Sequence, residues 1–430
     1  MPNDTTQSRR RFLKRAAAAA GASLAAPYVI PSGVLAAPGR PGANDRIIIG
    51  FIGAGGRAKQ LMAQMVEPGR IVAICDCYLP RAREASQLIG DGKWKTYQNY
   101  HKMIESEKLD AVVIPVTDHG RVLAAIAACQ AGLDVYAEKP LTVSIGEGRA
   151  LVKIARKHKR VFQVGSQQRS MEMNRYACEL VRKGALGKNL TVRGCNYTGP
   201  RRYTGLPKEK IPDGLDWDMW CGATELRPYN RQLQFGWMGW RSYSGGEMTN
   251  WGAHGIDQIQ WALGMSRTGP VEVWPVTPGP NGKVSMRYAN GVVVKLEIDK
   301  GGPMGGAQFS GDDGKIRIDR NGFLVRPDEL AKDRPGPEVA KVWAGEGLKI
   351  WNASLHMKNW LDCIRTRAQP VADVEIGHRS ISVCHLANIA REAGRKLQWD
   401  PAKETFVGDD EANRYLNRPR RKGYELPTSA

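Results

Sequence analysis

The chain has 430 residues, and a second domain is expected because single hydrophobic cores rarely grow beyond about 250–300 residues. Apolar residues make up 42% and charged residues 25%, which places the chain among globular proteins and excludes the disordered and membrane-embedded classes. The formal net charge of +20 permits a nucleic-acid partner. No run of Lys and Arg and no aromatic-basic recognition motif follows the N-terminal segment, so we expect none.

The first residues resemble an export signal. Ser8–Lys14 reads S-R-R-R-F-L-K and matches the twin-arginine pattern S-R-R-x-F-L-K at every fixed position. Ala16–Ala26 is weakly apolar and too short to span a bilayer, and the small residues that follow favour cleavage after Ala36. A disordered basic tail is the alternative. We predict a signal peptide over 1–36, recognition by the twin-arginine export machinery, and a mature protein that is periplasmic or otherwise exported, with no stable membrane span.

Residues 37–44 are rich in Gly and Pro and are expected to form a linker. Between 45 and 167, short apolar segments alternate with helical ones, which is typical of a doubly wound parallel sheet with right-handed connections. Strands are expected at Arg46–Ile52, Arg70–Cys75, Trp94–Tyr97, Asp110–Pro115, Leu133–Ala137 and Val161–Val164. Helices are expected after the first strand through Met65, from Pro80 onward, at Val122–Gln130 and at Gly146–His158.

From 168 to 430 the pattern changes and predicts an α+β domain with a large, mostly antiparallel open sheet. Strands are expected between Val271 and Leu324, at Lys283–Tyr288, Val292–Ile298, Gln308–Ser310 and Lys315–Ile318, and Leu190–Tyr197 is a separate stretch before them. Helices are expected at 172–183, from Trp251 to Leu263, at 352–366 and at 376–395. Thr198–Gly246 is expected to be loop-like, and the tail around Arg418–Arg421 to extend over the surface.

The first strand ends in a dinucleotide-binding fingerprint. Gly53–Ala58 reads G-A-G-G-R-A and fits G-x-G-x-x-[GA] between a strand and a helix. Gly53 permits the tight turn, Gly55 lets the backbone approach a pyrophosphate, and Ala58 permits close helix–strand packing. The N–H groups at the start of the helix face the phosphates. The sequence therefore predicts an N-terminal Rossmann domain.

Asp76 stands at the end of the second strand, 23 residues after Gly53. A carboxylate there accepts from the ribose 2′-hydroxyl and repels a 2′-phosphate, so NAD(H) is favoured over NADP(H). Arg57 would weaken this preference for NAD(H) if its charge bound a 2′-phosphate. The alternative role for Asp76 is that of an aspartate that initiates a turn. Because twin-arginine export carries folded proteins, we expect tightly bound NAD(H). Its site is predicted to comprise Gly53, Ala54, Gly55, Gly56, Arg57, Asp76, Glu138 and Lys139.

Glu138-Lys139-Pro140 follows the fifth strand, so Lys139 is expected at the carboxyl edge of the sheet, where the cofactor's reactive ring lies in such folds. Oxidation of a carbinol needs a base for the hydroxyl proton and a donor for the developing alkoxide. The Lys139 ammonium can be that donor. His254 can be the general acid/base, because a histidine can titrate near neutral pH without a large shift of its pKa. A surface lysine paired with Glu138 is the alternative.

Asn250, His254 and Asp257 share one face if a helix begins near Asn250, and Asp257 then orients His254 or pairs locally. We predict Lys139, His254, Asn250 and Asp257 as the catalytic set. Flat aromatic faces suit sugar rings, although interdomain or subunit packing is the competing interpretation for such residues. The predicted substrate contacts are Tyr197, Trp217, Trp220, Arg241 and Trp251.

The fingerprint, Glu138-Lys139-Pro140 and the segment Gly245–Asp257 together resemble the glucose–fructose oxidoreductase / inositol dehydrogenase (Gfo/Idh/MocA) family over nearly the whole mature chain. The twin-arginine signal and Trp399-Asp400-Pro401 resemble its secreted bacterial branch. The resemblance implies a nicotinamide over the open face of the second sheet, and a homo-oligomer. Many family members carry Asp where this chain has Asn250. Asn cannot take a proton, which leaves proton transfer to His254, with or without Lys139.

The remaining composition signals favour no metal site. The eight cysteines show no zinc-type spacing and are expected to be mainly buried free thiols, and His, Asp and Glu are not clustered. Three functions stay open. The first is an exported NAD(H)-dependent oxidoreductase that moves hydride to or from a hydroxyl-bearing carbon of a sugar, polyol or glycoside. The second is an NAD-dependent glycoside-cleaving enzyme with transient oxidation. The third is a catalytically silent sugar-binding protein.

Overall fold

The computed structural model describes residues 42, 45–343 and 352–427. The predicted signal peptide over 1–36 lies outside these residues, as does the predicted linker over 37–44 apart from Gly42. The chain divides into two units after Arg46, and both sheets belong to the unit that begins at Ile47. No helix of the described part is long and apolar enough to cross a membrane.

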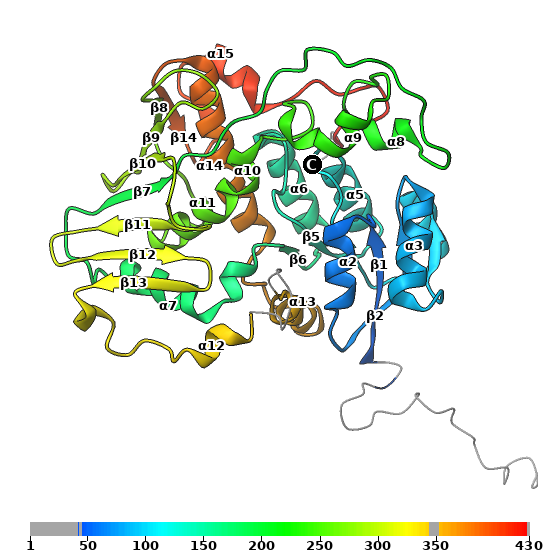
Figure 1. Cartoon of the computed structure of the whole chain (residues 1–430), viewed down its shortest axis with the longest axis horizontal. Helices are drawn as coiled ribbons and strands as arrows, with labels where there is room; N and C mark the ends of the chain where they lie inside the picture. Colours follow the sequence, from blue (N-terminus) through cyan, green and yellow to red (C-terminus); the bar gives the residue numbers. More distant parts are fainter. Residues whose placement is uncertain (1–41, 43–44, 344–351, 428–430) are drawn as a thin grey trace, which may run out of the picture. The chain divides into compact units, whose positions relative to one another are not determined.

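The first sheet has six parallel strands in the order β3-β2-β1-β4-β5-β6 (Figure 1). The order reverses between β1 and β4, which creates the switch point at which doubly wound sheets bind ligands. The strands are β1 (Ile47–Ile52), β2 (Gly69–Cys75), β3 (Lys95–Tyr97), β4 (Ala111–Ile114), β5 (Asp134–Ala137) and β6 (Phe162–Val164). All six predicted strands are confirmed to within one residue at either end, because apolar runs buried on both faces are easy to recognise.

Helices cover both faces of this sheet. One face carries α2 (Gly56–Ala63), α3 (Leu79–Gly90) and α13 (Ser354–Thr366), and the other carries α4 (Tyr100–Ser106), α5 (Asp118–Gln130) and α6 (Ile145–Lys157). The sequence placed α13 in the second domain, but it packs on the first sheet. Its Trp360 is fully buried, with its ring centroid 5.7 Å from that of Tyr136 in β5. The chain therefore returns to the first sheet to complete its apolar cover.

The second sheet has nine strands in the order β13-β12-β11-β7-β10-β9-β8-β14-β15, and only β7 and β10 pair in parallel. The strands are β7 (Thr191–Cys195), β8 (Glu272–Pro275), β9 (Val284–Arg287), β10 (Val293–Ile298), β11 (Ala307–Ser310), β12 (Lys315–Asp319), β13 (Gly322–Arg326), β14 (Leu397–Asp400) and β15 (Thr405–Phe406). The predicted, mostly antiparallel sheet is confirmed. The strands β8, β13, β14 and β15 were not individually predicted, because they are short and are defined by their pairing in the sheet.

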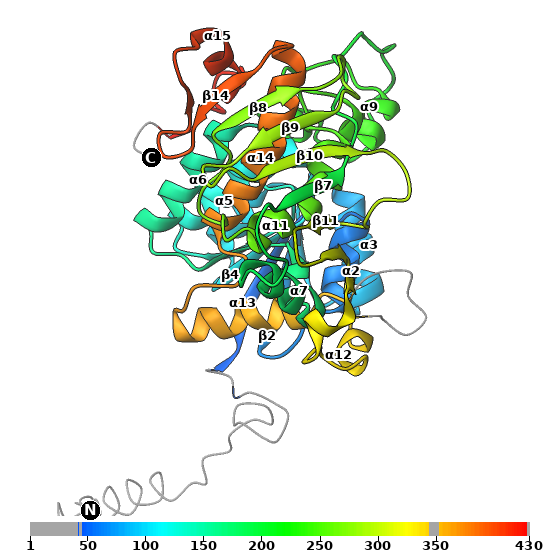
Figure 2. The same ribbon diagram turned by 90° about the vertical axis from the view of Figure 1, so that its left-hand side faces the viewer.

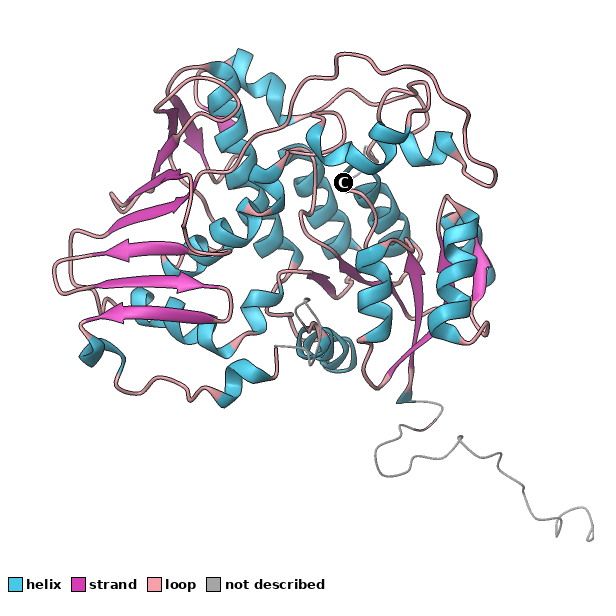
Figure 3. Cartoon of the chain, viewed as in Figure 1, coloured by secondary structure: helices cyan, strands magenta, loops and turns pink. Residues whose placement is uncertain are grey.

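Helices cover one face of the second sheet, and the other face is open (Figure 2). The covering helices are α7 (Glu172–Arg182), α11 (Gly252–Ala262) and α14 (Val374–Ala393). In Figure 3 these helices lie between the two sets of strands. α12 (Glu338–Lys341) and α15 (Asp410–Asn413) are single turns outside this layer.

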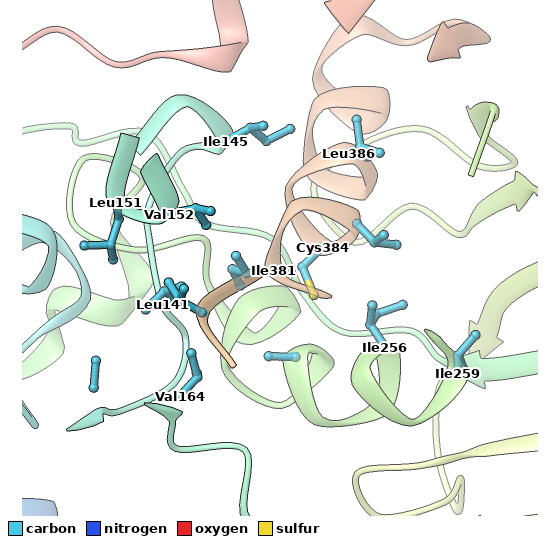
Figure 4. Packing of buried hydrophobic residues seen from close by; sticks show 14 of the residues in the cluster. Leu141, Ile145, Leu151, Val152, Val164, Ile256, Ile259, Ile381, Cys384 and Leu386 are labelled. Atoms are coloured by element: carbon cyan, nitrogen blue, oxygen red, sulfur yellow. The ribbon is translucent and has the colours of Figure 1, made fainter. Parts of the chain in front are cut away.

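One continuous apolar core joins the two sheets through α14. Figure 4 shows Ile381, Cys384 and Leu386 of α14 between α6, which carries Ile145 and Leu151, and α11. α14 is buried on nearly all of its sides, including polar residues such as His378 and His385, so it is a central helix rather than a surface one. α14 therefore sets the position of the parallel sheet relative to the helices that carry the second half of the site.

Residues 198–246, expected as a loop, contain α8 (Trp217–Cys221) and α9 (Arg231–Gly236). These short helices share a small apolar core, in which Trp217 and Trp220 stack with centroids 4.4 Å apart and planes at 10°. Helices of this length are stabilised by tertiary contacts rather than by intrinsic propensity, which is why no periodicity predicts them.

The C-terminal tail extends over the surface, as predicted, and it is also anchored there. Arg418 and Arg420 both form ion pairs with Glu147 of α6, whose side chain is only 1% exposed. Arg418 also donates to the backbone carbonyls of His119 and Ser242, each at 3.1 Å. The tail is held at this place because the buried carboxylate of Glu147 needs counter-charges and hydrogen bonds, which Arg418 and Arg420 supply.

Replacing Glu147 by Gln is expected to lower the free energy of unfolding by about 3–5 kcal/mol, because two buried guanidinium groups lose their counter-charge. Burial raises the pKa of Glu147 and the guanidinium groups of Arg418 and Arg420 lower it, with a net pKa below the usual value. The stabilisation is therefore present above the ordinary glutamate pKa and is lost as pH falls through the depressed one.

Denaturant unfolding at neutral and at acid pH tests this expectation. The loss should be large at neutral pH and should shrink in acid. Glu411→Gln is a matched control, since Glu411 pairs with Arg395 but its side chain is 72% exposed. Equal effects of the two substitutions at neutral pH would contradict the assignment.

Candidate active site

A cavity of about 710 Å³ opens at the carboxyl edge of the parallel sheet. Its floor comes from the residues that end or follow β1, β2, β4 and β5, among them Gly53, Asp76 and Lys139. Its other wall comes from the second half of the chain, including His254 and Arg320. The cavity therefore lies at the switch point of the sheet, where a dinucleotide is expected.

The glycine turn has the backbone that the fingerprint requires. Gly53 has φ 108°, and its N–H donates to the Cys75 carbonyl at 2.6 Å. A Cβ on Gly53 would lie 2.9 Å from the Val116 side chain, so a side chain is excluded there by both conformation and space. Nothing lies within 4 Å of a Cβ built on Gly55 or Gly56, which leaves the backbone N–H groups at the start of α2 open to the cavity.

Asp76 lines the cavity and is held by the backbone around it. Its Oδ2 accepts from the Ala54 N–H at 2.8 Å and its Oδ1 from the Tyr78 N–H at 2.9 Å. The second bond is that of an Asx turn, so the turn-forming role also applies. The Oδ1 also accepts a weak bond from the Cys77 thiol at 3.8 Å, and the Oδ2 has a further lone pair that can accept from a ribose hydroxyl.

Arg57 does not point toward Asp76. Its Nε donates to Glu138 at 2.9 Å and its Nη1 to Gln60 at 3.1 Å. Because Asp76 follows β2 and Glu138 follows β5, these two carboxylates stand on opposite sides of β1. The geometry therefore removes the reason to expect Arg57 to favour a 2′-phosphate.

Glu138 organises the floor of the cavity beside Lys139. It is 4% exposed and accepts from Arg57, from the Gln167 side chain at 3.0 Å and from the Lys139 backbone N–H at 3.2 Å. Burial raises its pKa while the charges of Arg57 and Lys139 lower it, with a net pKa below the usual value. A Cβ on Gly165 would lie 2.8 Å from the Glu138 carboxyl carbon, so Gly165 makes room for this carboxylate.

Lys139 meets α10 (Glu247–Asn250) from the second half of the chain. Its Nζ donates to the Asn250 Oδ1 at 2.8 Å and to the Asn250 carbonyl at 3.3 Å. The Asn250 Nδ2 in turn donates to Glu247 at 3.0 Å. Burial lowers the pKa of Lys139, and the carboxylates of Glu138 and Asp118 act in the opposite direction, with a net pKa below the usual value. Lys139 is thus a cavity lysine with its amine held in place, and not the surface lysine of the alternative.

His254 lies in the first turn of α11 and faces the same cavity. It is 6% exposed, and burial lowers its pKa well below the ordinary value, as do the charges of Lys139, Arg320 and Arg57. The ring is therefore neutral at neutral pH, and a neutral imidazole can accept a proton. The Lys139 amine and the His254 imidazole, which come from separate domains, line one cavity.

Asp257 does not orient His254, and this prediction is corrected. Its carboxylate accepts from the Arg169 Nε at 2.8 and 3.0 Å and from the Ser380 hydroxyl at 2.7 Å, and it does not line the cavity. Asn250 ends α10 and His254 lies in the first turn of α11, with Trp251 between them in a helical conformation, and both side chains line the cavity as expected. The buried guanidinium of Arg169 attracts Asp257 away from the site.

Two of the five predicted substrate residues line the cavity, namely Trp220 and Trp251. Trp217 lies behind Trp220 and donates its indole N–H to the Arg227 carbonyl at 2.7 Å. Arg241 pairs with Glu392 at 2.7 Å. Tyr197 is half-buried beside Met248 and is absent from the lining. The packing interpretation fits these three residues, since Trp217 belongs to the small apolar core of residues 198–246, Tyr197 packs on the main core and Arg241 forms an ion pair.

All eight cysteines are free thiols, six buried and two half-buried, as predicted. Within 45–343 and 352–427, no group of three or more His, Cys, Asp or Glu side chains is arranged to hold a metal ion.

Two family models match the chain. One, described as an oxidoreductase family, NAD-binding Rossmann fold, covers residues 47–166, and the other, described as an oxidoreductase family, C-terminal alpha/beta domain, covers residues 174–426. The chain belongs to the Gfo/Idh/MocA family of oxidoreductases. The predicted family and the NAD-binding domain are confirmed, whereas its twin-arginine branch stays a prediction.

Curated relatives of this Gfo/Idh/MocA chain match over part of their length. Inositol 2-dehydrogenase of Salmonella typhimurium is 27% identical over 168 residues, which make up 39% of this chain and 48% of the relative. Rhizopine catabolism protein MocA of Rhizobium meliloti is 28% identical over 225 residues, or 52% of this chain and 59% of the relative. The matched segments thus span about half the length of these curated relatives.

Solved structures share the fold over most of the chain. The WlbA dehydrogenase from Bordetella pertussis, in complex with NADH and UDP-GlcNAcA, has a TM-score of 0.61 at 18% identity and covers 83% of this chain and 99% of that one. The myo-inositol 2-dehydrogenase from Lactobacillus plantarum has a TM-score of 0.58 at 20% identity and covers 82% and 99%. These similarities show that the chain shares the fold of these two proteins.

Sequence reasoning missed several cavity residues of this family member. Asp118 and Arg121 follow β4, and Arg121 donates to the Val116 carbonyl at 2.6 Å and to the Pro140 carbonyl, which ties the β4 turn to the Lys139 turn. Charged residues directly after a buried strand were the available signal. Arg320 follows β12 and lines the cavity, and burial lowers its pKa to about 10 together with the charge of Arg57. No local pattern could place it there.

Asp76→Asn is expected to reduce the preference for NAD(H) over NADP(H) about tenfold or more, because the repulsion of a 2′-phosphate disappears. The single amide oxygen of asparagine can keep one of the two backbone bonds that Asp76 accepts. Titration of the purified protein with each dinucleotide measures both dissociation constants. Asp91→Asn, at an exposed aspartate that ends α3, is the matched control. A ratio unchanged by Asp76→Asn would contradict the role of this carboxylate.

Proposed function

We propose that this chain is an exported NAD(H)-dependent oxidoreductase that transfers hydride between nicotinamide and a hydroxyl-bearing carbon of a sugar, polyol or glycoside. The observation that carries the proposal is the shared cavity, in which the Lys139 amine and the His254 imidazole lie with the glycine turn and Asp76. An amine donor and a neutral imidazole beside a dinucleotide site are the groups that carbinol oxidation requires. The names of the curated inositol dehydrogenases support this class of substrate.

Each protein group has a defined task in the proposed oxidation. NAD+, when bound, accepts the hydride from the substrate carbon. The Lys139 Nζ donates a hydrogen bond to the reacting oxygen and stabilises its developing negative charge. The His254 imidazole accepts the hydroxyl proton, so the carbinol loses one proton and one hydride and becomes a carbonyl. In the reverse direction His254 returns the proton.

Asn250 acts on Lys139 rather than on the proton. Its side-chain oxygen accepts from the Lys139 Nζ and so fixes the amine at the cavity wall. Aspartate at this position would add a negative charge beside Lys139 and raise its pKa, whereas asparagine does not. The substitution therefore leaves His254 as the acid/base and retains a positioned donor.

The aromatic part of the cavity lining suits a sugar-like substrate. Trp237 and Trp251 line the cavity, and so does Phe235, although 61% of its surface is exposed. Aromatic faces stack on the C–H faces of sugar rings, and the polar groups of Lys139 and His254 then select a hydroxyl.

A redox-neutral cleavage of glycosides is the second candidate, and the twin-arginine pattern favours it, because an exported enzyme has no ready pool of free NAD. One experiment separates the candidates. The mature protein is purified, co-purified NAD is identified, and a panel of sugars, polyols and glycosides is added while reduced nicotinamide and released sugar are both followed. Lasting reduction supports the dehydrogenase. Release without net reduction supports cleavage, and neither event with NAD bound supports a silent sugar-binding protein.

Export and self-association belong to the same proposal. Fractionation of cells that express the chain, with N-terminal sequencing of the exported form, should reveal a start at Ala37. The open face of the nine-stranded sheet offers a surface for a homo-oligomer, and light scattering of the purified protein measures the mass. A cytoplasmic, uncleaved protein would refute the export part.

A further inference from the structure

Helix α8 from the second half of the chain lies over the cofactor edge of the first sheet. The Asp216 N–H donates to the Cys77 carbonyl at 2.8 Å, and the Leu79 N–H donates to the Gly214 carbonyl at 3.0 Å. These bonds attach the start of α8 to the turn that follows β2. Met219 and Trp220 of α8 line the cavity together with Asp76. In Rossmann domains the end of the second strand receives the adenosine ribose, so α8 covers that end of the site.

The C-terminal strap, defined here as residues 418–424, holds α8 from outside. Figure 1 shows the red C-terminal segment running from α15 toward α8. Arg421 donates to both carboxylate oxygens of Asp218, at 2.8 and 3.2 Å, and to the Gly222 carbonyl at 2.8 and 2.9 Å. The Tyr424 hydroxyl donates to Asp218 at 2.8 Å. An exposed ion pair alone is weak, but a bidentate arginine with added neutral bonds forms a directional network.

The other end of the strap is fixed to the first domain. Arg418 and Arg420 pair with the buried Glu147 of α6, and Arg418 binds the His119 carbonyl of α5. His119 in turn forms a hydrogen bond of 2.7 Å between its Nε2 and the Trp220 carbonyl. α8 is therefore held on both sides by groups anchored to the sheet that carries the glycine turn.

We propose that the C-terminal strap slows the release of NAD(H). Arg421 is the positioning residue, and it holds α8 over the adenosine end of the cavity. The cofactor leaves this end only if Met219 and Trp220 move, and their movement requires the Arg421 and Tyr424 bonds to Asp218 to break. This inference rests on the NAD-binding domain and not on the identity of the substrate. In this proposal the tail slows the release of NAD(H). An exported enzyme needs slow release, because it has no ready pool of free NAD.

Release of NADH tests the strap without any sugar present. The full mature chain is loaded with NADH, mixed with a large excess of NAD+, and followed by nicotinamide fluorescence. Arg421→Ala is expected to release NADH about tenfold faster or more, and Tyr424→Phe to release it faster by a smaller factor. Both variants should unfold near the wild-type temperature, since Glu147 keeps its two arginines.

The control is Arg395→Ala, which removes an arginine that pairs with Asp409 and Glu411 away from the cavity. NADH release at the wild-type rate from folded Arg421→Ala, or equal acceleration by Arg395→Ala, would overturn the proposal. If Arg421→Ala does not fold, Tyr424→Phe and Asp218→Asn decide, because each removes strap bonds and leaves the backbone contacts. A failure of the sugar panel leaves these rates unchanged, so the two proposals fail separately.

Discussion

Replacing Lys139 by methionine is expected to lower the rate of hydride transfer about 10³-fold while NAD binding changes little. Methionine keeps an unbranched side chain of similar length but cannot donate to the reacting oxygen. The Lys139 Nζ is held by Asn250 at the cavity wall, so its loss removes a positioned donor rather than a mobile one. The loss should fall mainly on kcat, because the developing alkoxide exists only in the transition state.

Steady-state rates with the best sugar of the panel, together with NADH titration by fluorescence, measure this effect. Lys358→Met is the matched control, since Lys358 forms an exposed pair with Asp362 on α13. Activity of Lys139→Met within tenfold of the wild type, with NAD bound, would rule out Lys139 as the donor.

Replacing His254 by glutamine is expected to lower the rate of alcohol oxidation about a hundredfold or more, because the proton of the substrate loses its acceptor. The effect also has a pH signature. Burial lowers the pKa of His254, and the charges of Lys139, Arg320 and Arg57 lower it further. The ring accepts a proton only above its pKa, so wild-type oxidation should stay active below the ordinary histidine range and fail only in stronger acid.

The pH profile of kcat/KM for oxidation checks this assignment. The acid limb should disappear in His254→Gln, whereas His158→Gln, at the half-buried end of α6 outside the cavity, should leave it in place. An acid limb that persists unchanged in His254→Gln would show that another group takes the proton.

The first domain could be predicted almost completely from the sequence. Its strands are short apolar runs, and the glycine turn and Asp76 belong to one local strand–turn–helix–strand unit. Lys139 follows a recognisable strand, so its place at the carboxyl edge follows from the topology of a parallel sheet. Local residues decide each of these features, and the structure agrees with them.

Long-range contacts decided the features that were missed. Asp257 pairs with Arg169, which lies 88 residues earlier, and the strap pairs with Glu147, which lies 271 and 273 residues earlier. A buried charge always needs a counter-charge, but the sequence alone does not identify which residue supplies it in the folded chain. The same applies to Arg320, which reaches the cavity from a turn of the second sheet.

Sequence alone determined that this chain carries a Rossmann unit with a glycine turn, a carboxylate after its second strand and a lysine at the edge of its sheet, because each depends on a few neighbouring residues and on the period of their burial. Only the tertiary structure decided which aromatic residues face the cavity, that Asp257 turns away from His254, and that the tail is attached to α8. Those outcomes depend on how separate elements pack into one core and neutralise each other's buried charges. Such long-range contacts cannot be inferred from a local sequence pattern.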